Sequence, residues 1–204
     1  MLSLLFTSPD IFFISAIGLV LAITIHEFSH AFVANHLGDP TARSLGRVSL
    51  NPLAHLDPIG TAMLFFAGFG WGKPVPFDPY NLSRPRRDSA LISLAGPASN
   101  LVMALLLTLI SQNLFHGILL SKFIFLIAIN ISLAVFNLIP VHPLDGAKIV
   151  TGLLPRDLAY EWENISNRYG SLILIALILP IGGSSLVSSI TSPIINLILN
   201  ILIK

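Results

Sequence analysis

The chain has 204 residues, of which 54% are apolar and only 10% are charged, and its formal net charge is +1. Soluble domains usually carry about 25% charged residues, so this composition argues against a soluble protein and predicts one all-α polytopic membrane domain over residues 1–204. Cysteine is absent and no basic cluster is interleaved with aromatic residues, which excludes disulfides, cysteine-based zinc sites, a cysteine nucleophile and nucleic-acid binding.

Residues 11–36 are predicted to form the first membrane-spanning helix. Pro9-Asp10 marks its start, and Gly38-Asp39-Pro40 ends it. The fifteen residues 11–25 carry no charge, so the polar residues that follow lie deep in the bilayer. No Lys or Arg precedes the apolar run, and we therefore expect no removable signal peptide.

The next segment is predicted to associate with the membrane without crossing it. Alternating residues 43–50, followed by Asn51-Pro52, indicate a short strand or β-hairpin and a turn. Residues 59–70 are apolar but too few to span the bilayer comfortably, which favours a re-entrant segment. Such backbone must be buried in protein or line a watery cavity. A proline-rich polar loop follows over residues 71–88.

Two further spanning helices are predicted at residues 89–110 and 117–139. Gly96-Pro97 lies inside the first of them, where we expect a kink or a close contact with another helix. Pro140 and Pro143 end the second. These helices complete a predicted catalytic core over about residues 10–155.

The remaining residues, 156–204, are predicted to add C-terminal helices. Residues 155–168 carry five charges and an aromatic pair, as in an interfacial amphipathic helix. Residues 171–190 are predicted to form a fourth spanning helix, broken near Pro180. The apolar tail, residues 194–204, is short, and its pattern leaves open whether it spans, lies flat or packs on a neighbour.

The positive charges predict an orientation. Nine of the eleven Lys and Arg residues lie in two connections, between the first and second and between the third and fourth expected helices: Arg43, Arg47, Lys73, Arg84, Arg86, Arg87, Lys148, Arg156 and Arg168. If residues 59–70 do not cross, all nine lie on one side. The positive-inside rule makes that side cytoplasmic, with the N-terminus outside.

The strongest chemical signal is His26-Glu27-Phe28-Ser29-His30. Residues four apart share a helix face, so His26 and His30 can bind one Zn²⁺ together. Glu27 lies about 100° further round the helix. It could therefore act as general base toward a zinc-activated water and pass the proton to the leaving amine.

A catalytic zinc ion usually has a third protein ligand. Asp145 follows a proline-broken helix end at membrane depth, and His142 is its rival three residues earlier. Asn137, near the end of the same helix, could donate to an oxyanion or make an interhelical hydrogen bond. Asn100 has the same two alternatives, with a packing role favoured.

These motifs resemble those of the site-2 protease family, the zinc metalloproteases that cut within membranes. His26-Glu27-x-x-His30 matches the first family motif, and Asn137-x-x-Pro140 leading to Leu144-Asp145-Gly146 matches the second. NPLAHLDPIGT (51–61), GWGKPVPFDPYNL (70–82) and AGPASN (95–100) look like segments of the compact prokaryotic members. The resemblance covers about residues 10–155.

The resemblance implies Asp145 as third zinc ligand, Glu27 as general base and Asn137 as an oxyanion or substrate-strand contact. It also implies a β-hairpin after the first helix that steers an unwound substrate, and a place in a prokaryotic plasma membrane. No PDZ or CBS module is recognised, and Ala147 stands where many relatives have glycine.

The predicted function is zinc-dependent hydrolysis of a peptide bond in the transmembrane helix of a membrane-protein substrate. The alternative is a zinc transporter or a metal-binding membrane protein without protease activity. A transporter should offer ligands along a path, but the expected spans 89–110 and 171–190 contain no His, Asp or Glu. The sequence leaves substrate and oligomeric state open.

Overall fold

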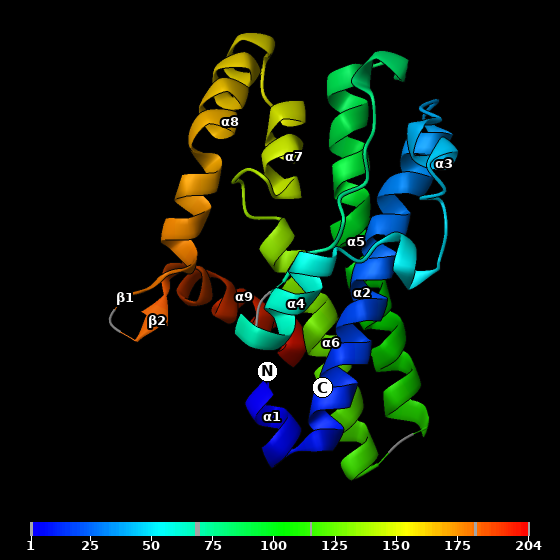
Figure 1. Cartoon of the computed structure of the whole chain (residues 1–204), viewed down its shortest axis with the longest axis vertical. Coiled ribbons are helices and arrows are strands. Elements are labelled where there is room, and N and C mark those ends of the chain that lie inside the picture. The colour runs from blue at the N-terminus through cyan, green and yellow to red at the C-terminus, as the bar shows by residue number, and fades with distance from the viewer. Residues whose placement is uncertain (1, 68–69, 115, 182, 204) are drawn as a thin grey trace.

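The computed structural model describes residues 2–67, 70–114, 116–181 and 183–203, and its regular structure is almost entirely helical. Three long helices, α2 (Pro9–His36), α5 (Pro85–Leu114) and α6 (Ile118–Asn137), pack against one another (Figure 1). Within the described residues, these three are long and apolar enough to cross a membrane. The expected all-α polytopic membrane fold is confirmed.

Helix α2 follows the expected boundaries closely. Pro9 occupies the first turn together with Asp10, both of which suit a helix N-terminus. A short helix, α1 (Leu2–Thr7), precedes it. At the other end Gly38 adopts a φ of 105°, a left-handed conformation that ends the helix after His36.

Helix α5 begins at Pro85, about one turn before the expected start. The backbone N–H of Arg84 donates to the Asp88 carboxylate at 2.8 Å, so the charged residues ahead of the apolar run close the first turn. Pro97 lies inside this helix and is fully buried. The apolar run alone therefore underestimates the helix.

The hairpin expected within residues 41–56 is wrong. These residues form a short helix, α3 (Thr41–Ser44), and a 3₁₀ turn, η1 (Pro52–Ala54). The Asp39 carboxylate accepts the N–H of Thr41 at 3.1 Å, and the Asn51 side chain accepts that of Leu53 at 3.1 Å. These local caps compete with strand pairing and suit turns instead.

Strand-like pairing in the described part of the chain is sparse. An isolated antiparallel bridge joins Leu56 to Gly72, and β1 (Pro180–Ile181) pairs with β2 (Ser184–Ser185). A second 3₁₀ turn, η2 (Pro79–Asn81), lies between that bridge and α5.

The apolar segment expected to be re-entrant contains α4 (Pro58–Ala67), while residues 68–69 lie outside the described ranges. Ten helical residues measure only about 15 Å, half of the hydrocarbon thickness. In Figure 1 the start of α5 and the helix α3 lie at the same end of the molecule as α7 (Asp145–Leu153), whereas α1 lies at the opposite end. The two charged connections, the one between α2 and α5 and the one after α6, therefore lie at the same end of the molecule.

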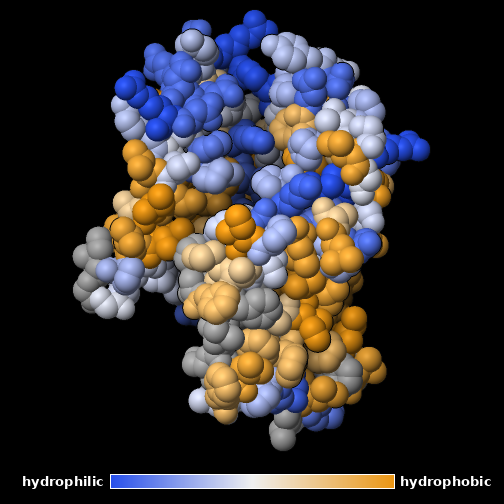
Figure 2. Space-filling view, in the orientation of Figure 1, coloured by the Kyte–Doolittle hydropathy of each residue, from blue (hydrophilic) through white to orange (hydrophobic). Residues whose placement is uncertain are grey.

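Polar and apolar surfaces divide along the same axis. Figure 2 shows hydrophilic residues gathered at the end that holds α7 and the start of α5, and hydrophobic residues over the sides below it. An exposed apolar surface of this extent is expected for helices that face lipid.

The helix expected over residues 171–190 is wrong. One helix, α8 (Arg156–Ile178), joins the charged segment to the first apolar residues and stops before Pro180. Only a short apolar stretch remains before the proline, too little for a spanning helix. The tail instead belongs to α9 (Leu186–Leu202), which packs against α6 around Ile127 and Ile131.

Candidate metal centre

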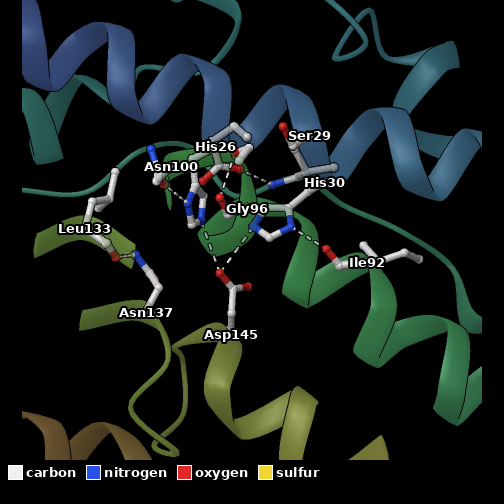
Figure 3. A network of polar contacts seen from close by, with 12 residues as sticks. His26, Ser29, His30, Ile92, Gly96, Asn100, Leu133, Asn137 and Asp145 are labelled. Carbon is white, nitrogen blue, oxygen red and sulfur yellow. Dashed lines mark hydrogen bonds and ion pairs between the residues drawn. The ribbon is translucent and has the colours of Figure 1, made fainter. Parts of the chain in front are cut away.

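Three potential ligands converge where α2 meets the first turn of α7. Asp145 Oδ2 lies 3.1 Å from His26 Nε2 and 3.3 Å from His30 Nε2, and one ligand atom from each residue lies within 4.8 Å of the others. Ligand atoms bound tetrahedrally at ~2.0–2.2 Å from zinc lie about 3.3–3.6 Å apart. The donor types and their spacing therefore fit a zinc ion with one open position (Figure 3).

The rival ligand does not join this group. His142 packs against α8, where a Cβ at Gly170 would lie 2.6 Å from the His142 Cβ. Burial lowers the pKa of its imidazole. The break after α6 thus turns Asp145 toward α2 and His142 toward α8.

The two imidazoles are held in one tautomer. His30 Nδ1 donates to the carbonyl of Ile92 at 2.7 Å, and His26 Nδ1 donates to Asn100 Oδ1 at 2.7 Å. Protonation at Nδ1 leaves the Nε2 lone pair of each ring available for a metal, and such partners fix ring orientation. Both partners lie on α5 (Figure 3).

Asn100, for which an interhelical packing role is expected, makes such hydrogen bonds and also contacts His26, which the sequence did not predict. It is fully buried, and its Nδ2 donates to Ala22 O and to Asn130 Oδ1, both at 3.1 Å. These bonds leave its Oδ1 facing His26. The sequence signal for the contact with His26 is the four-residue spacing between Gly96 and Asn100, which puts both residues on one face of α5.

Replacing Asn100 with Ala is expected to weaken zinc binding about 10–100-fold, because His26 loses the partner that holds its tautomer. Competition of the purified protein with a zinc chelator of known affinity measures the change. Asn196→Ala, which removes an exposed amide on α9, is the matched control. Equal zinc affinity for Asn100→Ala and the control would contradict this role.

The close helix contact expected at Gly96-Pro97 is made with the histidines themselves. A Cβ at position 96 would lie 2.5 Å from His30 Nε2 and 2.6 Å from His26 Nε2. Only glycine leaves room there, since real Cβ atoms do not approach so closely. Gly96 therefore lets α5 pass directly behind the ligand group.

Glu27 and the ligand group line a cavity of about 310 Å³. Glu27 Oε2 accepts a hydrogen bond of 3.1 Å from the backbone N–H of Val75, in the loop that covers the site. Much of the wall is apolar and comes from the spanning helices: Ile23, Ile92, Leu133 and Phe136. Lys148 also lines it, with its Nζ 4.4 Å from the centre of the Phe77 ring.

Asn137 also lines the cavity, but its amide is engaged elsewhere. Asn137 Nδ2 donates to Leu133 O at 2.9 Å, one turn back in its own helix (Figure 3). The structure thus places it at the site and gives it a local partner.

Comparison with known proteins points to one family. The model of peptidase family M50 matches residues 111–177. The chain is 36% identical over 177 residues to the Bacillus subtilis protein named "Putative zinc metalloprotease YwhC", covering 81% of this chain and 80% of that one. No solved structure is significantly similar.

More distant relatives carry related names. Identity is 31% over 181 residues with the Mycolicibacterium smegmatis protein named "Putative zinc metalloprotease Rip2", covering 83% of this chain and 68% of that one. It is 26% over 165 residues with "Zinc metalloprotease MJ0392" of Methanocaldococcus jannaschii, covering 78% and 40%. With an HExxH helix, a converging aspartate and these relatives, the chain belongs to the site-2 protease family, peptidase family M50, and is a zinc metalloprotease.

Proposed function

We propose that this metalloprotease hydrolyses a peptide bond within or near the transmembrane helix of membrane-protein substrates. In this proposal His26, His30 and Asp145 hold one zinc ion and Glu27 is the general base. The observation that carries the proposal is the depth of the ligand group along a spanning helix.

That depth follows from helix geometry. His26 lies sixteen residues after Asp10 on α2, or about 24 Å along the axis. Asp10 pairs with Lys122 at 3.3 Å, and such an exposed ion pair suits the membrane–water boundary at that end. With hydrocarbon about 30 Å thick, His26 lies inside it and nearer to the opposite face.

The chain's own residues have separable roles. A bound zinc ion would supply Lewis-acid activation of water and of the scissile carbonyl. Glu27 accepts a proton from the attacking water and returns it to the leaving amine. Asn137 can donate to the developing oxyanion once its amide turns away from the Leu133 carbonyl. Water or substrate can then replace the amide as hydrogen-bond donor to that carbonyl.

The substrate must be locally unwound before it is cut. Carbonyls in an intact helix are already hydrogen-bonded and shielded by side chains, so water cannot attack them. The shared end of the two charged connections is proposed to be cytoplasmic, in a prokaryotic plasma membrane, by the positive-inside rule. Water would then reach the site from the cytoplasm and the N-terminus would lie outside.

Reconstitution in liposomes tests the proposal. The probes are single-span model proteins, matched in length, with or without a Gly-Pro pair in the cytoplasmic half of the span. Mass spectrometry of the products should map cleavage to that half, faster with the helix-breaking pair. Chelation should stop cleavage and zinc should restore it. Cleavage of unfolded soluble casein with every span left intact would overturn the intramembrane assignment.

A further inference from the structure

Arg47 is a buried cation that binds backbone carbonyls. Arg47 is only 4% exposed. Within the described residues, no carboxylate forms an ion pair with its side chain. Its Nη1 donates to Pro74 O at 3.0 Å, and its Nη2 donates to Lys73 O. Burying a charge costs free energy unless its partners are well placed. The burial of Arg47 therefore suggests a functional role.

His55 completes the arrangement. This residue is fully buried, and its Nε2 donates to Ser49 O at 2.7 Å. Burial lowers the pKa of the imidazole, so the ring is neutral and its Nδ1 is an acceptor, 3.5 Å from Arg47 Nη2. The His55 carbonyl accepts the N–H of Lys73 at 2.7 Å. Lys73 is thus held through both its N–H and its C=O group, and Pro74 through its C=O group.

The held segment ends on the proposed general base. Val75 N–H donates to Glu27 Oε2 at 3.1 Å. Prolines flank this residue at positions 74 and 76, and proline has no N–H, so Val75 supplies the only backbone donor of the three. At Gly72, a Cβ would lie 3.5 Å from Glu27 Oε1, which shows how closely the segment passes.

We infer that Arg47 is a positioning residue for catalysis. Its guanidinium sets the carbonyls of residues 73 and 74, these set the Val75 N–H, and that N–H holds the Glu27 carboxylate beside the metal ligands. This inference rests on the proposed role of Glu27 as general base. Without the hydrogen bond, Glu27 would sample several rotamers, and a misplacement of about 1 Å can cost about 10²-fold in rate.

The arrangement also explains why arginine occupies this position. Two neighbouring carbonyls and an imidazole nitrogen need several donors in a fixed geometry, which the planar guanidinium provides. Lysine would keep the charge but carries its donors on a single nitrogen, which cannot reproduce the planar two-nitrogen geometry of the guanidinium. Arg47→Lys therefore removes the geometry while it preserves the charge.

The first test compares Arg47→Lys with Arg43→Lys, a change at an exposed arginine four residues earlier. Arg47→Lys should lower kcat about 10–100-fold, with zinc content and KM within about twofold of wild type. Hydrogen exchange of the peptide containing Val75 should also become faster, and this readout does not depend on activity. Arg43→Lys should change none of these quantities.

A double-mutant cycle tests the route through the backbone. Val75→Pro removes the N–H from a segment already flanked by prolines, and Val75→Ala retains it. The Val75→Pro variant should resemble Arg47→Lys, and the double variant should be no slower than the slower single one. Val75→Ala, which retains the N–H, should lose less rate than Val75→Pro.

The outcomes separate the two proposals. Wild-type kcat for Arg47→Lys, or additive losses in the double variant, would overturn the role of Arg47. Loss of zinc or of folded protein in Arg47→Lys, with kcat per zinc unchanged, would also overturn it and indicate a purely structural residue. If Glu27→Gln is inactive while Arg47→Lys is fully active, only the inference fails, whereas an active Glu27→Gln removes the proposed mechanism itself.

Discussion

Replacing Glu27 with Gln is expected to leave zinc bound and to lower the cleavage rate about 10²–10⁴-fold, the range typical of a lost general base. Gln has almost the same shape, and its amide oxygen can still accept from the Val75 N–H. It cannot accept a proton from water at neutral pH. The metal ligands do not include Glu27, so the ion should remain.

The measurement is single-turnover cleavage in liposomes, together with zinc content per protein. Ser29→Ala is a matched control on the same helix turn, because the Ser29 hydroxyl donates to Ile25 O in its own helix and faces no ligand. This control should retain wild-type cleavage. Full activity of Glu27→Gln would exclude Glu27 as the base.

The second large effect is expected at Asp145. Its replacement by Ala should remove zinc and abolish cleavage, because two histidines alone leave the ion short of the usual three protein ligands. His142→Ala should retain zinc, since His142 is not part of the converging ligand group and its Cβ lies against Gly170 on α8. The pair of variants separates the two candidates that lie three residues apart.

Zinc content after dialysis at fixed free zinc, measured on protein of equal thermal stability, decides between them. Asp145→Asn adds a finer step, because the amide keeps the shape and loses the charge. Zinc retained in Asp145→Ala and lost in His142→Ala would reverse the ligand assignment.

The long helices could be predicted because their signal is local. The uncharged run of residues 11–25 and the stop at Gly38-Asp39-Pro40 place α2 almost to the residue. The HExxH spacing likewise places two imidazoles on one helix face before any fold is known. Hydropathy and i,i+4 spacing involve only residues that are close together in the chain, so both can be read from the sequence alone.

The wrong predictions concern short sequence patterns. In one case local caps override the pattern, and in the other a helix continues beyond it. The alternation near residues 43–50 resembles a strand, but Asp39 and Asn51 cap turns instead. The change from charged to apolar residues predicts two separate helices, yet residues 156–178 contain no helix stop and form one helix that ends before Pro180. Short windows cannot weigh these alternatives, because the deciding partner lies outside them.

The chain's composition and motif spacing suffice for a membrane-embedded zinc metalloprotease with His26, Glu27 and His30 on one helix. They cannot choose between Asp145 and His142, because both follow the same proline-broken helix end and the choice depends on which neighbour each side chain meets. Folding brings Asp145 to α2 and His142 to α8. It also places Asn100 in hydrogen-bond contact with His26. The buried Arg47 meets the loop that contacts Glu27. These contacts join residues tens of positions apart, so their geometry exists only after the helices have packed.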